Sequence, residues 1–188
     1  MVDEREIGRR VKEGIIGVIR GAGEVTQAAV ETVATTIQTT LKQGGETGTA
    51  AAELGVGAVK GAIDAAGDVG GQAAETAADT VEKAVDSASK VGASVGNAAK
   101  GAMIGTVRGS SDLGIEALGA VGTTSRTAVS EAGAIGADLT TAAVGAVEGA
   151  IEVAKETGLN VEEAAAAAAT GAIEAAGEVG TAAAVRVR

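Results

Sequence analysis

The sequence contains no cysteine, histidine, proline, phenylalanine, tyrosine or tryptophan among its 188 residues. Without cysteine and histidine it lacks the usual protein ligands of zinc and haem, the thiol nucleophile, the disulfide bond and the imidazole base that works near neutral pH. These absences remove most enzyme chemistry. We therefore expect a protein with no metal, no cofactor and no enzymatic activity.

The absence of aromatic side chains also limits which partners the protein is expected to bind. Proteins that bind single-stranded nucleic acid stack the bases on aromatic rings and attract the phosphates with basic grooves. This chain has no aromatic ring, and its 15 Lys and Arg stand against 25 Asp and Glu, which gives a net charge of -10. The sequence therefore predicts no nucleic-acid partner.

Long apolar runs are absent too. A membrane-spanning helix needs roughly 18 or more consecutive apolar residues, whereas charge interrupts every apolar stretch here, as at Glu148 and Glu152. Residues 1–10 are charged where a secretory signal needs an apolar core. We expect no transmembrane segment and, by default, a cytoplasmic protein, with extracellular assembly after non-standard export as the alternative.

The sequence does contain an internal repeat. The segment Gly17-Val-Ile-Arg-Gly-Ala-Gly-Glu-Val resembles three others that begin at 44-residue intervals, at Gly61, Gly105 and Gly149. Looser copies lie midway between them, so the finer unit is 22 residues. We divide the chain into a charged N-terminal helix start, 1–16, and a repeat region, 17–188, of eight units of which the last is truncated.

The columns of the aligned units indicate an α-helix. The third column is aliphatic from Ile19 to Ile173, and the eighth is mostly charged, as at Asp112 and Glu156. Six turns over one unit give roughly 3.67 residues per turn, close to the helical 3.6, and this wheel gathers the aliphatic and small columns on one side. The sequence therefore predicts an all-α fold of long amphipathic helices with 11-, 22- and 44-residue repeats, packed as helical hairpins in a homo-oligomeric assembly.

The 30 glycines oppose helix formation, because each glycine inside a helix costs about 1 kcal/mol relative to alanine. Close approach of two helix backbones can offset that cost. Gly-x-x-x-Gly pairs recur at 44-residue intervals, and the tenth column is glycine in nearly every unit. We predict that both sets pack helix against helix: Gly48, Gly57, Gly61, Gly70, Gly92, Gly101, Gly105, Gly114, Gly136, Gly145, Gly149, Gly158 and Gly180.

Some glycines have an alternative reading as turns. Cap and turn residues cluster at Gly44-Gly45, at Gly109-Ser110-Ser111 and at Thr157-Gly158. Carboxylate pairs such as Glu148 with Glu152 stand on the polar side of the wheel without a histidine to join them, so we interpret them as solvated faces rather than a metal or acid/base site. Residues 127–178 carry one basic side chain against nine acidic ones, which leaves this part of the chain strongly negative.

The columns resemble the eleven-residue amphipathic repeats of the alpha-synuclein and perilipin kind. The segment Ala73-Ala-Glu-Thr-Ala-Ala-Asp-Thr-Val-Glu-Lys-Ala-Val-Asp86 is similar to repeats of late-embryogenesis-abundant proteins. The first resemblance implies a protein that binds a lipid surface, and the second implies one that protects drying cells.

The leading functional hypothesis is a structural protein that associates with itself into a filament, sheath or other homo-oligomer. An isolated helix with so much glycine would be marginal, and a repeat presents the same surface again and again. The first alternative is an amphipathic coat on a lipid droplet, granule or membrane. The second is a stress, desiccation or ice-active protein, and a scaffold for an unidentified partner completes the set.

Overall fold

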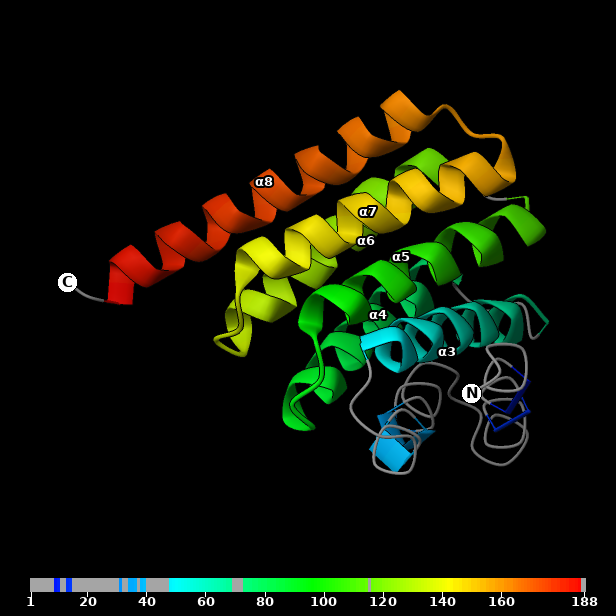
Figure 1. Ribbon diagram of the computed structural model, residues 1–188, viewed down its shortest axis with the longest axis horizontal. Helices are drawn as coiled ribbons and strands as arrows, with labels where there is room; N and C mark the ends of the chain where they lie inside the picture. Colours follow the sequence, from blue (N-terminus) through cyan, green and yellow to red (C-terminus); the bar gives the residue numbers. More distant parts are fainter. Residues whose placement is uncertain are drawn as a thin grey trace.

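A computed structural model describes residues 9–10, 13–14, 31, 34–36, 38–39, 48–68, 73–114 and 116–186. Six helices follow one another in this part of the chain, which contains no strand (Figure 1). They are α3 (Gly48–Asp68), α4 (Ala73–Lys90), α5 (Val95–Asp112), α6 (Ala117–Ala134), α7 (Leu139–Thr157) and α8 (Val161–Arg186). The fold is all-α, as the sequence predicts.

The 22-residue period is the distance from one helix start to the next. Helices α4 to α8 begin at residues 73, 95, 117, 139 and 161, and α4 to α6 are each 18 residues long. Each 22-residue unit is therefore one helix plus one short turn. The helical wheel over a whole unit implies instead six helical turns without a break. The helices end because glycine in the left-handed conformation recurs at the same step, at Gly92, Gly114, Gly136 and Gly158.

A capping position follows each of these glycines by two residues. The Asp138 carboxylate accepts hydrogen bonds from the Thr140 amide at 2.9 Å and the Thr141 hydroxyl at 2.7 Å. Ser94 and Asn160 cap α5 and α8 in the same way, while Glu116 precedes α6 without a side-chain cap. The unit thus carries its own stop and start signals.

The helices form two layers in zigzag order (Figure 1). Helices α3, α5 and α7 lie side by side in one layer, and α4, α6 and α8 in the other. Consecutive helices contact each other across the layers as hairpins. The 44-residue period in the sequence is thus the step between neighbours within a layer.

The core between the layers is built from small side chains. Most of its buried residues are alanine and valine, and the largest fully buried side chains include Leu54, Ile63 and Met103. Small side chains give little buried area each, so the array gains stability from helix backbones that come unusually close.

Candidate functional site: glycine-packed faces and the end of the array

Two predicted glycines of α5 pack directly on the backbone of α3. A Cβ at Gly105 would lie 2.6 Å from the carbonyl oxygen of Val56, and one at Gly101 would overlap the carbonyl oxygen of Ala52. A Cβ atom does not come this close to an atom to which it is not covalently linked. No side chain larger than glycine fits at either position without moving α3.

The same contact recurs one 44-residue step later. A Cβ at Gly149 would lie 2.6 Å from the carbonyl oxygen of Lys100, and one at Gly145 would overlap that of Gly96. The other layer uses the same device, because a Cβ at Gly171 would overlap the carbonyl oxygen of Gly122 on α6. Glycine thus sets the spacing of neighbours in both layers.

The remaining predicted glycines divide into several groups. Gly57 and Gly61 are buried within α3. Gly48 is the first residue of α3, and its contacts lie outside the described part, as does the whole of Gly70. Gly180 lies in α8, but it is exposed and a Cβ there would meet nothing within 4 Å, so the packing prediction is wrong for this residue.

The prediction is also wrong for the tenth-column glycines of the inter-helix turns. Gly92, Gly114, Gly136 and Gly158 have φ between 68° and 76°, and a Cβ at any of them would meet no atom within 4 Å. Their requirement is conformational, because L-residues other than glycine rarely adopt positive φ. Of the alternative turn readings, Thr157-Gly158 is right, Gly109 to Ser111 lie inside α5, and Gly44-Gly45 lies outside the described residues.

Sequence reasoning missed several packing glycines. A Cβ at Gly96 would lie 2.7 Å from the carbonyl oxygen of Thr141, and those at Gly55, Gly109 and Gly133 would also be crowded. Gly171 could have been found, because it stands in the same first column of the repeat as Gly105 and Gly149. Gly133 also stands in a column that is mostly glycine, whereas Gly55 and Gly96 are the single glycines of their columns and gave no signal.

Ion pairs link the same neighbouring helices. The Lys60 ammonium lies 2.6 Å from the Asp112 carboxylate, Lys100 lies 2.7 Å from Glu152, and Arg108 lies 2.7 Å from Glu156. In the other layer Arg126 pairs with Glu174 and Glu178. Each pair is partly exposed and contributes about 0.2–1 kcal/mol. The pairs therefore set the alignment of neighbouring helices and add little to the stability of their packing.

Two of these charged groups, and also Glu131 of α6, have displaced pKa values. Burial opposes the charge of Lys60, but hydrogen bonds and attraction from Asp112 and Asp64 raise its pKa above the usual value. The hydrogen bond to Glu152 raises the pKa of Lys100. Burial, with repulsion from Glu82 and Asp86, raises the pKa of Glu131.

The C-terminal end of the array leaves its helix faces uncovered. In α6, Gly122, Ser125 and Gly133 contact α8, and Val129 lies on the same stripe and is fully buried. The matching residue of α8, one 44-residue step later, is Ile173, and it is 73% exposed.

The other layer ends in the same way. Met103 of α5 lies under α7 and is fully buried, while its counterpart Val147 of α7 is half-buried. Beside it on α7, Val144 is 51% exposed. We name the residues that match the covered stripes the outer end face: Thr140, Val144, Val147 and Ile151 of α7, with Ala169, Thr170, Ile173 and Gly177 of α8.

The described residues contain no group of three or more Asp or Glu side chains placed to hold a metal ion. Among the described helices, none is long and apolar enough to cross a membrane.

No protein-family model matches the chain, and no curated protein matches it. Among solved structures, it is similar to a de novo designed helical repeat protein at 18% identity and a TM-score of 0.47, with 94% of this chain and 95% of that chain covered.

Proposed function

We propose that this chain is a non-enzymatic structural protein that associates with a second copy of itself through the outer end face. One observation carries the proposal: Ile173 is 73% exposed at a position where Val129, one repeat step earlier, is fully buried. Among the described helices, the stripe of α6 that carries Val129 is covered by α8, whereas no described helix covers the matching stripe of α8.

The surface that fits such a face is another helix of the same kind. Inside the array, the stripes of α5 and α6 that match the outer end face are covered by α7 and α8, helices of the same repeat. Small residues at Ala169 and Gly177 permit close approach of a second backbone, and Val144 and Ile173 supply apolar area. A second copy presents all of these features.

We infer a contact in which the outer end face meets itself. The alternative, in which the start of one chain continues the array of another, needs a glycine where the sequence has Glu13, since this residue stands 44 residues before Gly57. The Glu13 side chain is 66% exposed and pairs with Arg9, and a charged side chain at this place obstructs glycine-type packing. Self-complementary contact gives a closed pair with two-fold symmetry.

Such a pair would be a rod with the same two layers as one chain, each layer twice as long, and its α3 and α4 ends would point outward. The structural role that this geometry supports is to hold the two outward ends at a fixed distance from each other. Because the exposed Glu148 of α7 is next to Val147 of this face, and residues 127–178 are strongly acidic, association should strengthen as salt screens the repulsion between the copies.

The test is the mass of the protein in lipid-free buffer by light scattering after size exclusion. We expect a species of twice the 17.9 kDa chain, and its reduction to one chain in the double variant Val144→Asp with Ile173→Glu. Leu113→Asp is the matched control, because Leu113 is 39% exposed but lies at the end of α5, away from the outer end face. A single-chain mass for the unaltered protein at all salt concentrations would refute the proposal.

A lipid surface is the competing occupant of the same face. Flotation with vesicles of mixed neutral and anionic lipid separates the two. Self-association predicts that the unaltered protein stays with the aqueous phase, whereas flotation that the double variant abolishes would favour the coat hypothesis.

A further inference from the structure

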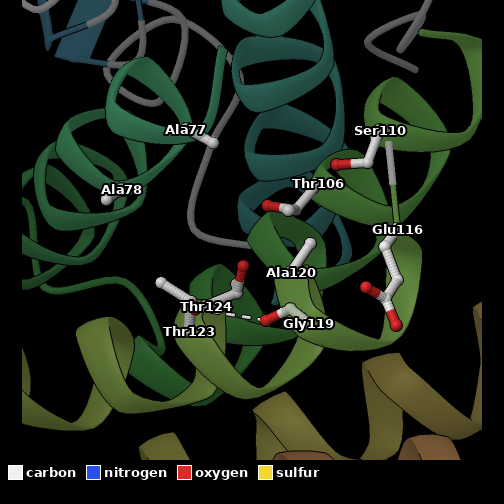
Figure 2. A pocket seen from close by; sticks show the side chains of 9 residues that line it. All are labelled: Ala77, Ala78, Thr106, Ser110, Glu116, Gly119, Ala120, Thr123 and Thr124. Carbon is white, nitrogen blue, oxygen red and sulfur yellow. Dashed lines mark hydrogen bonds between the residues drawn. The ribbon is translucent and has the colours of Figure 1, made fainter. Parts of the chain in front are cut away.

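A cavity of about 230 Å³ lies between α4, α5 and α6 (Figure 2). Its inner wall is formed by Ala77 of α4, Thr106 and Ser110 of α5, and Thr124 of α6, each at most 6% exposed. Its mouth is formed by more exposed residues, Glu116, Gly119 and Thr123. The cavity therefore has a buried inner wall and a mouth that is open to solvent.

Four hydroxyl-bearing residues surround this space, and the repeat makes them conspicuous. One 44-residue step later, Thr106, Ser110, Thr123 and Thr124 correspond to Ala150, Ala154, Ala167 and Ala168. These four residues line one cavity, although Ser125, which also matches an alanine, lies elsewhere, and Thr80 already carries a hydroxyl at the place of Thr124. In Figure 2 the hydroxyl groups of Thr106, Ser110 and Thr124 point into the space between the helices.

A difference in volume from the next repeat step accompanies the cavity. Ala77 stands where the next repeat step has Val121, which is fully buried in the corresponding place on α6. The two missing methyl groups leave space beside the hydroxyls. The repeat is thus altered in two matching ways, by removal of volume and by addition of polar atoms.

The hydroxyls differ in what they can offer. Thr106 donates its hydrogen to the carbonyl oxygen of Ala102 at 2.9 Å, so its lone pairs remain as acceptors. The hydroxyls of Ser110 and Thr124 make no hydrogen bond to any residue that the structure describes, so they can both donate and accept. Neither of these two oxygen atoms is both buried and unpaired, so each is open to solvent and available to a bound polar atom.

We propose that this cavity binds a small, uncharged, mainly apolar molecule that carries one hydroxyl or carbonyl group. An apolar cavity of about 150 Å³ holds benzene, so the volume here admits a ring with a short polar substituent. Anions fit poorly, because no basic side chain lines the cavity and hydroxyls alone do not offset the burial of a charge. The acidic side chain that lines it, Glu116, is exposed at the mouth and offers no buried partner to a cation.

Benzyl alcohol and toluene are the probes, because they share a ring and differ by one hydroxyl. The chain has no aromatic residue, so in deuterated buffer their ring protons are observed without overlap, and saturation transfer from the protein reports binding. We expect saturable binding of both probes, with benzyl alcohol bound about three- to tenfold more tightly through its extra hydrogen bond.

Two variants separate the contribution of the cavity volume from that of the Ser110 hydroxyl. Ala77→Val places the side chain of the next repeat step in the cavity and should weaken both probes more than tenfold. Ser110→Ala removes a hydroxyl and should bring benzyl alcohol to the level of toluene while toluene is unchanged. Ala166→Val, the same change as at Ala77 on an exposed site of α8, should leave both probes unaffected.

Absence of saturable binding would overturn the proposal, as would binding that Ala77→Val leaves intact. If Ala77→Val fails to fold by circular dichroism, the Ser110→Ala comparison decides, and equal loss of both probes or of neither would overturn the hydroxyl assignment.

Discussion

Val129 is fully buried on α6, whereas Ile173, at the same position of α8 one repeat step later, is 73% exposed. The two side chains differ by a single methylene, so their chemistry does not explain the difference. The difference is the presence of a covering helix, since α8 lies on α6 and no described helix lies on the far side of α8. The proposed contact between two copies would bury this apolar surface.

Close packing at glycine predicts a loss of stability on adding a methyl group. Gly145→Ala should lower the free energy of unfolding by about 1–3 kcal/mol, because the new Cβ would overlap the carbonyl oxygen of Gly96 and backbone atoms cannot move aside cheaply. Urea titration followed by circular dichroism measures the change.

Gly180→Ala is the matched control for this prediction. The residue is exposed in α8 with open space around it, so only helix propensity changes, and stability should rise by up to about 1 kcal/mol. Equal effects of the two substitutions would show that glycine contributes nothing to the spacing of the helices.

The turn glycines predict a different dependence on side-chain type. Gly136 has φ of 72° and open space for a Cβ, so Gly136→Ala should cost about 1–2 kcal/mol from the left-handed conformation alone. Gly136→Asn should cost less, because asparagine tolerates this conformation better than alanine does. Thermal unfolding of both variants checks the order, and a larger loss with asparagine would indicate steric rather than conformational strain.

The two kinds of glycine show which parts of the structure could be predicted from the sequence. The 44-residue spacing of Gly101, Gly105, Gly145 and Gly149 identified the packing face, because a face that meets a neighbour once per step must repeat at that step. The tenth column misled, since a constant glycine fits both a close contact and a turn. A capping residue two positions later, as at Asp138 and Asn160, was the signal that distinguishes them.

The outer end face and the cavity could not be predicted from the sequence, for a related reason. Ile173 belongs to the same aliphatic column as the buried residues, and only the position of α8 at the end of its layer exposes it. Likewise Ala77 and Ser110 are ordinary small residues until the turns fix which helices enclose them. Both features depend on where each helix begins and ends within the repeat unit.

The cap at Asp138 predicts a pH dependence. Hydrogen bonds from the Thr141 hydroxyl and from the Thr140 and Thr141 amides lower its pKa below the usual range. Its contribution to stability is therefore complete above the pKa of the unfolded chain and is lost as pH falls through the lower folded value. Asp138→Asn keeps a good cap but does not titrate, so the variant should match the parent near pH 7 and lose less stability below about pH 4. Parallel acid titrations of the two proteins measure the difference, and identical curves would contradict it.

Glu131 predicts the opposite dependence. Burial, with repulsion from Glu82 and Asp86, raises its pKa, so the folded state holds this proton more tightly than the unfolded state does. The resulting stability is present below the unfolded pKa and disappears as pH rises through the folded value. Glu131→Gln should therefore stabilise the protein at pH 7 by no more than about 1 kcal/mol. The midpoint of urea unfolding checks this, with Glu163→Gln on the exposed first turn of α8 as the comparison.

The contact between two outer end faces can be measured directly, because a chain without cysteine accepts one label at one chosen site. A nitroxide attached to Val144→Cys should show dipolar coupling to the same label on a second copy in pulsed electron resonance, and the coupling should disappear when labelled chains are diluted with unlabelled ones. The same label at Leu113→Cys should give a much weaker coupling. A Val144→Cys sample without intermolecular coupling, under conditions where the protein has twice the mass of one chain, would place the contact elsewhere and contradict the proposed interface.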